Sequence, residues 1–193
     1  MSATTNADRV LELVDDRPPS LGRGRLICID GPAGSGKTTL ATEIAALTGA
    51  PVVHMDNLFE GWAGLPTVDQ QLDRLLRPLA RNRPGSYRRW DWYAGTWAEV
   101  VVVPPAPLLV LEGVGSGSRT HAGLITCLVW VEVAPDLRLE RGLARDGAEM
   151  DEHWRQWSAA EQVHFAQDGT RARSDLVVDG TRGSSDRAGV DRP

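Results

Sequence analysis

The feature that most constrains the fold is a glycine-rich run between a short apolar segment and an amphipathic one. Residues 31–38 read GPAGSGKT and match the pattern G-x-x-x-x-G-K-[ST] at every fixed position. Residues 25–30 (RLICID) predict a buried strand before it, and residues 39–47 (TLATEIAAL) predict a helix after it. Glycines let such a loop curl so that backbone N–H groups point inward, beside the positive end of the helix dipole. The unit therefore predicts a phosphate-binding loop.

The residue types in this loop also predict what it binds. Nucleotide contacts are expected from Gly31, Ala33, Gly34, Ser35, Gly36, Lys37, Thr38 and Thr39. Lys37 is the one lysine among 21 lysine and arginine residues, and its compact ammonium fits between β- and γ-phosphate oxygens where a planar guanidinium does not. The Thr38 hydroxyl is expected on Mg²⁺. Because no guanine-reading N-K-x-D sequence follows, the predicted ligand is ATP with Mg²⁺ rather than GTP.

The rest of the chain alternates between strand and helix patterns. Helices are predicted over 6–15, 68–80, 135–145 and 151–166, and strands over 52–55, 108–111, 126–133 and 176–178. Two β-prone runs within 86–103, on either side of Ala94-Gly95-Thr96, predict a hairpin. Strands that alternate with helices predict an α/β fold, with a parallel sheet covered by helices on both faces.

Composition and charge narrow the range of partners. The 193 residues fit one domain, and a net charge of -5 disfavours DNA, RNA and anionic lipid as ligands, which leaves a small molecule. No run of 18 apolar residues predicts a membrane span, and the first 25 residues lack the apolar core of a secretory signal. Cys28 and Cys127 lie in apolar runs and are predicted to be buried thiols. A cytoplasmic location is the default expectation.

Two acids follow predicted strands directly. Asp56 follows the strand over 52–55. Glu112 stands at the end of the next core strand, in the run PLLVLEG, which has the Walker B form with Glu in place of Asp. Ligands of open parallel sheets bind outside the carboxyl ends of the strands. Asp56 is therefore a candidate for accepting the proton of an acceptor hydroxyl, or for holding Mg²⁺ through water, and Glu112 for a Mg²⁺ contact. The alternatives are a turn cap for Asp56 and a polar strand end for Glu112.

Arginines recur at spacings of three and four in the helix predicted over 135–145. Arg138, Arg141 and Arg145 share one face of this helix. Such a row suits closure over a polyphosphate, where guanidinium groups stabilise negative charge during transfer. A solvated arginine face is the alternative. Beside a phosphate-binding loop we favour closure.

The hairpin segment is rich in aromatic and charged residues. It contains Trp90, Trp92 and Trp97, which together with Trp62 make four of the seven tryptophans. The other residues of this set are Tyr87, Arg88, Arg89 and Asp91. These side chains either stack on a base and bond a sugar, or pack the hairpin onto the sheet. His54, His121, His153 and His164 show no metal-ligand spacing and are expected to be structural or on the surface.

The pattern as a whole resembles the uridine kinase family of P-loop nucleoside kinases, in particular its actinobacterial members. The resemblance spans most of residues 25–180, through IDGPAGSGKTTLA, VVHMDNLF, YRRWDW, LLVLEGVGSGS, RLERGLARDG and ARSDLVVDG. It implies a three-layer α/β/α P-loop fold, with a five-stranded parallel sheet and a β-hairpin inserted over the acceptor site. The expected organisation is an N-terminal helix and linker over 1–20, a P-loop kinase domain over 21–182 and, from its polar, Gly- and Ser-containing sequence, a disordered tail over 183–193.

The resemblance also implies roles. Asp56 matches the catalytic base for the sugar 5′-hydroxyl, Glu112 the acidic Mg²⁺ partner, and Arg141 and Arg145 the lid arginines. With Lys37 on the phosphates, this implies ATP-dependent phosphoryl transfer to a small-molecule hydroxyl, with a nucleoside favoured as acceptor.

Two alternatives stay open. One is a kinase of nucleoside monophosphates or other metabolites, for which Arg88 and Arg89 would supply the cations that bind an acceptor phosphate. The other is a regulatory nucleotide-binding module that phosphorylates nothing small. The sequence also leaves homo-oligomer formation open.

Overall fold

The computed structural model describes residues 4–181. The helices are α1 (Asn6–Asp15), α2 (Lys37–Thr48), α3 (Asp69–Leu79), α4 (Pro135–Asp146), α5 (Asp151–Asp168) and α6 (Thr170–Arg173). The strands are β1 (Arg25–Asp30), β2 (Val52–His54), β3 (Gly85–Asp91), β4 (Thr96–Val103), β5 (Leu108–Glu112), β6 (Cys127–Glu132) and β7 (Leu176–Asp179). The 3₁₀ turns are η1 (Met55–Asn57), η2 (Gly61–Ala63), η3 (Leu65–Thr67), η4 (Arg119–Leu124) and η5 (Ala148–Met150). The tail predicted over 183–193 lies outside the described residues.

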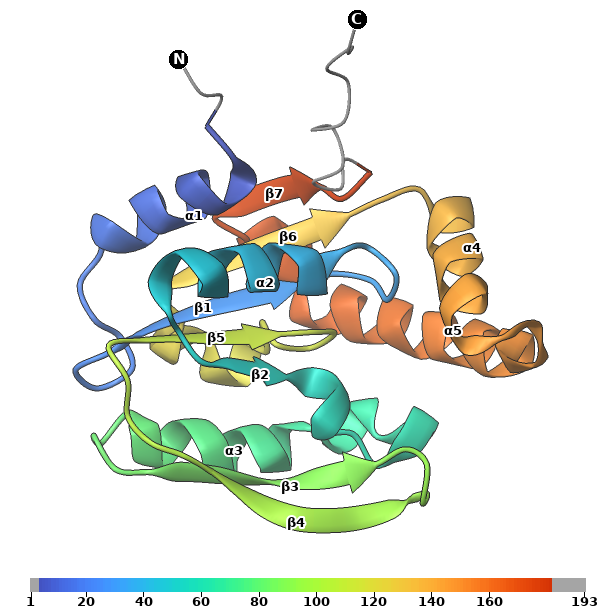
Figure 1. Ribbon diagram of the computed structural model, residues 1–193, viewed down its shortest axis with the longest axis horizontal. Helices are drawn as coiled ribbons and strands as arrows, with labels where there is room; N and C mark the ends of the chain where they lie inside the picture. Colours follow the sequence, from blue (N-terminus) through green and yellow to red (C-terminus); the bar gives the residue numbers. More distant parts are fainter. Residues whose placement is uncertain (1–3, 182–193) are drawn as a thin grey trace, which may run out of the picture.

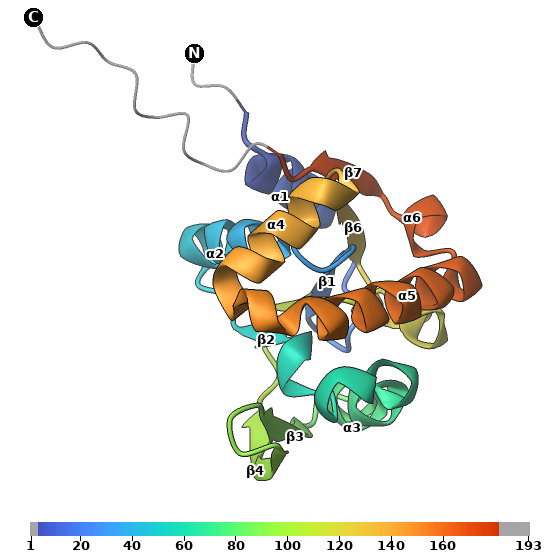
Figure 2. The ribbon, with the colours of Figure 1, turned by 90° about the vertical axis from the view of Figure 1, so that its right-hand side faces the viewer.

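The central sheet has five parallel strands in the order β2-β5-β1-β6-β7, as Figure 1 shows. Strands β3 and β4 form a separate antiparallel hairpin. The predicted fold class, with its five-stranded parallel sheet and inserted hairpin, is confirmed. Figure 2 looks onto the carboxyl ends of the strands, where α4 and α5 lie in front of the sheet.

Two apolar clusters cover opposite faces of the sheet. On one face, α1 and α2 pack on alternate residues of the central strands, among them Ile27 and Ile29. On the other face, α3, α5 and the hairpin pack around Leu26 and Cys28. Because neighbouring residues of a strand point to opposite faces, the apolar run of β1 fills both clusters, which accounts for its nearly complete burial. Cys28 and Cys127 are buried free thiols, as predicted.

The predicted strand over 52–55 ends one residue early, at His54. Residues 55–57 form the 3₁₀ turn η1, which the N–H of Leu58 closes by donating to the carbonyl of Met55. Met55 is fully buried in the α3-side cluster, whereas the next residue, Asp56, is exposed. The turn therefore presents Asp56 at the end of the strand. Within residues 4–181, no helix combines the length and apolar character needed to span a membrane.

Candidate functional site

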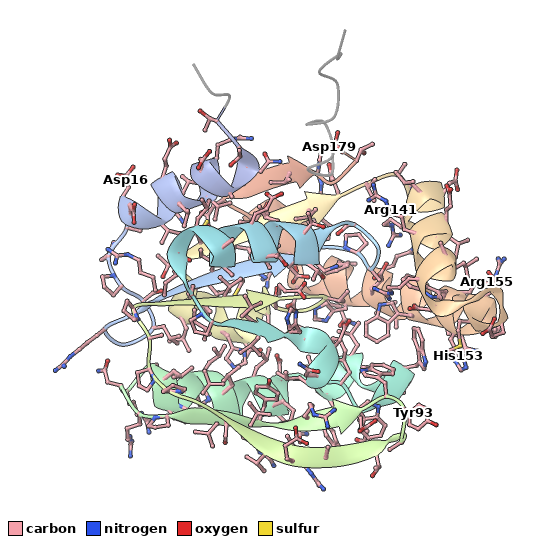
Figure 3. The ribbon with its side chains drawn as sticks, viewed as in Figure 1. Asp16, Tyr93, Arg141, His153, Arg155 and Asp179 are labelled. Carbon is pink, nitrogen blue, oxygen red and sulfur yellow. The ribbon has the colours of Figure 1, made fainter. Side chains whose placement is uncertain are left out.

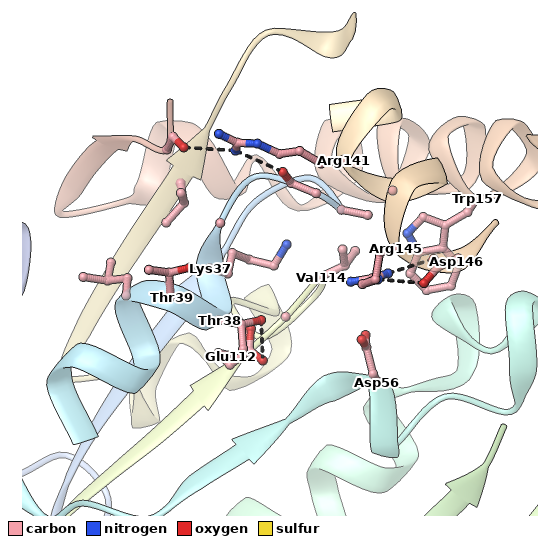
Figure 4. A pocket seen from close by; sticks show the side chains of 18 of the residues that line it. Lys37, Thr38, Thr39, Asp56, Glu112, Val114, Arg141, Arg145, Asp146 and Trp157 are labelled. Atoms are coloured by element: carbon pink, nitrogen blue, oxygen red, sulfur yellow. Dashed lines mark hydrogen bonds and ion pairs between the residues drawn. The ribbon is translucent and has the colours of Figure 1, made fainter. Parts of the chain in front are cut away.

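A pocket of about 770 Å³ opens at the carboxyl ends of the strands. One end is lined by the phosphate-binding loop and the start of α2, through Ala33, Gly34, Gly36, Lys37, Thr38 and Thr39. The other end is lined by Asp56 and an aromatic wall of Phe59, Trp62, Trp92, Trp154 and Trp157. The two ends belong to one continuous space, part of which is drawn in Figure 4. It is large enough for a nucleotide together with part of a second small molecule.

The phosphate-binding loop has the conformation that its glycines predict. Gly34 and Gly36 have φ angles of 77° and 97°, in the left-handed region that favours glycine. A Cβ at Gly34 would also lie 2.7 Å from the carbonyl oxygen of Arg138, so α4 packs directly on the loop. Gly31 and Ser35, both predicted to contact nucleotide, are not among the residues that line the pocket. The Ser35 hydroxyl is buried without a hydrogen-bond partner.

Lys37 lies at the first position of α2 and lines the pocket. Its Nζ donates to the carbonyl oxygen of Pro32 at 2.8 Å, which holds the ammonium inside the curl of the loop. Burial lowers the pKa of Lys37, and the nearby charges of Glu112, Asp30 and Asp56 oppose that shift. A partly desolvated ammonium interacts strongly with anions, so this position suits phosphate oxygens.

Thr38 and Glu112 face each other where β5 ends. The Thr38 hydroxyl donates to Glu112 Oε1 at 3.3 Å. His54 Nδ1 lies 2.5 Å from the same carboxylate oxygen, and this hydrogen bond raises the pKa of His54. Hydroxyl and carboxylate oxygens are ligands that Mg²⁺ accepts, and Mg²⁺ typically takes only one or two protein groups besides water and phosphate. Among residues 4–181, no group of three or more His, Cys, Asp or Glu side chains could hold a metal ion. Thr38 and Glu112, the two residues expected on Mg²⁺, stay the candidates.

All four histidines were expected to be structural or on the surface. His54 does not line the pocket, and the strand register places it beside Glu112, because the two residues lie opposite each other in the β2–β5 pair. The other three histidines make no contact with Glu112 or the phosphate-binding loop among the described interactions.

Asp56 points into the pocket from η1, as Figure 4 shows. Its carboxylate is open to the pocket but surrounded by protein atoms, and this desolvation raises the pKa of Asp56. The charge of Lys37 opposes the shift, and that of Glu112 adds to it. The backbone carbonyl of Asp56 accepts a hydrogen bond from Trp92 Nε1 at 2.8 Å, so the hairpin fixes the turn that carries the carboxylate.

The aromatic wall is assembled from three separate segments. Trp62 is its centre, with Trp92 of the hairpin turn at 5.6 Å between ring centroids and Trp157 of α5 at 6.1 Å. The ring of His153, at the start of α5, stacks on the ring of Trp62, with 5.4 Å between the ring centroids and 12° between the ring planes. Figure 3 shows His153 on the same side of the molecule as Tyr93 of the hairpin turn. Trp62 and Trp92 are the wall residues with the most solvent-exposed surface, so they offer ring faces to a ligand.

The hairpin tryptophans divide between the two interpretations that the sequence left open. Trp90 and Trp97 pack edge to face at 5.1 Å within the hairpin, and neither lines the main pocket. Trp92 alone of the three reaches that pocket. Trp154 and Trp157, which lie three residues apart on α5, were missed, although this spacing places two large aromatic side chains on one helix face.

The three arginines of α4 have different surroundings. Arg138 is nearly buried, with 12% of its side chain exposed, and it pairs with Glu161 instead of lining the pocket. Arg141 lines the pocket and donates to the carbonyl of Gly180 at 3.0 Å, just beyond Asp179 at the end of β7 (Figure 3). Arg145 lies across from Asp56 (Figure 4). An ion pair with Asp146 at 2.7 Å raises the pKa of Arg145.

The hairpin arginines are engaged away from the main pocket. Arg88 donates to the carbonyl of Ala98 at 3.2 Å and lines a smaller cavity of about 340 Å³. Arg89 pairs with Glu99 at 2.7 Å and lies 3.7 Å from Asp91. Neither guanidinium lines the pocket that holds Asp56.

A buried acid joins the phosphate-binding loop to the loop after β5. Asp30 is fully buried and accepts hydrogen bonds from the N–H groups of Gly31, Gly115 and Gly117 at 2.7, 2.9 and 2.8 Å. Burial raises the pKa of Asp30, and these three donors oppose the shift. Asn6 of α1, which lies outside the predicted site, is also among the residues that line the pocket.

No protein-family model matches the sequence. Among curated proteins, the chain is similar to a cytidylate kinase of Halobacterium salinarum, 31% identical over 103 residues that cover 44% of this chain and 54% of that protein. It is also similar to a cytidylate kinase of Pyrobaculum arsenaticum, 27% identical over 139 residues that cover 72% and 70% of the two chains. The match to the first relative thus spans about half of that protein's length.

Solved structures show the same fold. A possible uridine kinase from Bacillus stearothermophilus aligns with a TM-score of 0.63 at 19% identity, covering 89% of this chain and 98% of that one. A "putative fructose transport system kinase" from a Silicibacter species aligns with a TM-score of 0.69 at 21% identity, covering 92% and 98%. The chain is therefore similar in sequence to two cytidylate kinases and shares its fold with solved structures described as kinases. The finer resemblance to actinobacterial proteins stays a prediction.

Proposed function

We propose that this protein transfers the γ-phosphoryl group of ATP to a hydroxyl of a small, uncharged, ring-bearing molecule, with a nucleoside such as uridine or cytidine as the favoured acceptor. The observation that carries the proposal is the single pocket that joins the phosphate-binding loop to a carboxylate and an aromatic wall. A pocket used only to bind nucleotide has no need of the second end. The similarity to kinases in sequence and fold supports the same reading.

At the donor end, the loop backbone and Lys37 hold the phosphates of ATP. The inward N–H groups and the start of α2 bind phosphate oxygens, and the Lys37 ammonium neutralises charge on the β- and γ-phosphates. Thr38 and Glu112 are the residues that hold Mg²⁺, which neutralises phosphate charge when bound. Arg141 lies beside the loop, where it limits the movement of the bound nucleotide.

At the acceptor end, Asp56 orients the hydroxyl and accepts its proton as the phosphoryl group transfers. Its raised pKa brings it closer to the working pH, which improves a general base as long as the carboxylate stays ionised. Arg145 faces Asp56 and Glu112, whose charges add to the raised pKa of Arg145. From there its guanidinium stabilises the negative charge that develops during transfer.

The charges of the acceptor end favour an uncharged acceptor. Apart from Lys37 and Arg141 beside the phosphate-binding loop, Arg145 is the one cation among the residues that line the pocket, and it is paired with Asp146. A phosphate on the acceptor would need dedicated cations. Arg88 and Arg89, the candidates for that role, are engaged elsewhere in the hairpin. Aromatic ring faces without added cations suit a flat base or another ring.

A nucleoside monophosphate is the second candidate acceptor, because both curated relatives are cytidylate kinases. In that case Arg145 would have to exchange Asp146 for the acceptor phosphate. The two candidates differ by one phosphate group, so matched pairs of acceptors separate them.

The test is ADP formation with Mg²⁺ and ATP against paired nucleosides and nucleoside monophosphates, together with simple sugars. Lys37→Ala serves as the blank. Turnover with uridine or cytidine that exceeds turnover with the matching monophosphates supports the proposal. A preference for monophosphates supports the second candidate, and tight ATP binding without acceptor-stimulated turnover by any compound argues against a kinase of such acceptors.

A further inference from the structure

A buried ion pair, whose two side chains do not line the pocket, contacts the phosphate-binding loop. Glu161 of α5 has 1% of its surface exposed, and its Oε1 lies 2.5 Å from Arg138 NH1 of α4. Its Oε2 accepts a hydrogen bond from the N–H of Ala33 at 2.8 Å. Arg138 in turn donates to the carbonyl of Ala33 at 3.3 Å. Both backbone polar groups of one loop residue are therefore held by a single pair of side chains.

The same two helices carry the residues of the opposite pocket end. Trp157 lies one turn before Glu161 on α5, so the two side chains share a helix face. Arg141 and Arg145 lie one and two turns after Arg138 on α4. Ala33 is thereby hydrogen-bonded to side chains of both helices that line the acceptor end.

We infer that Glu161 is a positioning residue that couples the conformation of the phosphate-binding loop to the aromatic wall of the acceptor end. Two charges removed from water are costly, and an apolar pair of similar volume often stabilises a core as well or better. The pair here makes specific bonds to a loop residue that lines the pocket, which an apolar pair cannot make. The inference rests on the proposed binding of nucleotide at this loop, but not on the identity of the acceptor.

The coupling has an optical readout, because a tryptophan is part of the coupled wall. Binding of Mg²⁺ and the non-hydrolysable analogue AMP-PNP is expected to change tryptophan fluorescence, and Trp157→Phe identifies the part that comes from Trp157. In Glu161→Gln, one amide oxygen must serve two donors and the negative charge is lost. At saturating AMP-PNP, this variant is expected to lose the Trp157 response. Its kcat is expected to fall about 10-fold while the KM for ATP changes less, since a small misplacement of reacting groups slows the chemical step.

A double variant, Arg138→Met with Glu161→Met, removes both charges together and protects the test against an unfolded protein. It is expected to stay folded, to bind AMP-PNP and to lack the Trp157 response. A full response in either folded variant, or a wild-type protein that binds AMP-PNP without a Trp157 response, overturns the inference alone. A wild-type protein that fails to bind AMP-PNP overturns the proposed function instead.

Discussion

The two ends of the pocket differ in whether backbone or side-chain groups line them. The donor end is a continuous segment in which backbone N–H groups and a helix start do most of the binding, with Lys37 and Thr38 as the added side chains. The acceptor end is made of side chains from η1 and η2, the hairpin turn, α4 and α5. A loop made of backbone binds whatever carries the phosphates, whereas a wall of separate side chains changes its specificity with single substitutions. Under the proposed function, the donor end would determine the kind of reaction, and the acceptor end would determine the molecule that receives the phosphoryl group.

Because the two ends are built differently, substitutions at each end should change different kinetic and binding constants. Changes at the acceptor end should alter kcat or the KM for the acceptor and leave ATP affinity intact. Changes at the donor end should alter both. A substitution at Asp56 gives the largest expected effect, and substitutions within the aromatic wall give smaller ones.

Asp56→Asn should lower kcat by about 10²–10⁴-fold, the range that a positioned general base contributes. The amide keeps the size of the side chain but accepts a proton poorly. ATP affinity, measured by calorimetry with AMP-PNP, should stay within about 3-fold of the wild-type value, since the loss lies in the chemical step. Equal losses in kcat and in ATP affinity would make Asp56 mainly a metal ligand and would break the separation.

The dependence of activity on pH is a second test of Asp56 as the general base. Burial in the pocket raises the pKa of Asp56, and only the deprotonated form accepts a proton. Activity should therefore fall as pH falls through this raised pKa, at a higher pH than an ordinary aspartate would give. In a plot of kcat/KM against pH, this acidic limb should be absent from the residual activity of Asp56→Asn. A limb that persists in the variant would belong to another group.

Lys37→Ala should lower kcat by about 10²–10³-fold, comparable with the loss of one preorganised charge-stabilising donor. Unlike Asp56→Asn, it should also weaken ATP binding, because the ammonium contacts phosphate before and during transfer. Lys37→Arg is the matched control, since it keeps the charge but adds a planar group that does not fit between phosphate oxygens. If Lys37→Arg retained full activity, a compact ammonium would not be required at the loop.

The sequence predicts the fold and the donor end well for a physical reason. Apolar periodicity and glycine or proline breaks are local signals, and they predict the core strands to within one or two residues at each end. The G-x-x-x-x-G-K-[ST] pattern is also local, because its function depends on the backbone of consecutive residues. The position of Asp56 at the pocket was predictable because it follows a strand directly, and strand ends meet at one edge of a parallel sheet.

The acceptor end is less predictable because it depends on which elements become neighbours. His54 reaches Glu112 only because β2 pairs with β5 in the observed register, and strand order is not visible in the sequence. Trp62 meets Trp157 only because α5 crosses beside η2. The role assumed for Arg138 as a third closing arginine is wrong for a related reason, since its partner Glu161 lies 23 residues away in the chain.

Trp92→Phe should lower kcat about 5-fold. It keeps an aromatic ring in the wall but removes the N–H that fixes the Asp56 carbonyl, and one hydrogen bond contributes about 1 kcal/mol. The KM for the acceptor should change little, because the ring remains. Trp92→Ala, which removes both ring and donor, should raise that KM as well. Identical kinetics for the two variants would show that the bond to Asp56, and not the ring, is what matters.

The smallest expected effect is that of Gly142→Ala, which displaces a ring of the aromatic wall without changing any of the wall's own residues. A Cβ at this position of α4 would lie 2.4 Å from the Trp154 ring, closer than two atoms can approach, so the ring must move. Overpacking costs about 1–3 kcal/mol. Alanine in place of glycine returns about 1 kcal/mol of helix propensity, so the net loss of stability should not exceed about 2 kcal/mol.

The kinetic consequence of Gly142→Ala should be confined to the acceptor, with a KM raised about 2–5-fold and unchanged ATP affinity, as expected for a shifted wall that still binds. Gly123→Ala is the matched control, because a Cβ there meets nothing within 4 Å. If Gly142→Ala weakened ATP binding as much as acceptor binding, the coupling inferred through Arg138 and Glu161 would be strong enough to carry the displacement of Trp154 to the bound nucleotide. The two ends of the pocket would then respond together. Substitutions at the acceptor end would leave ATP affinity intact only where the substituted residue contacts a ligand directly.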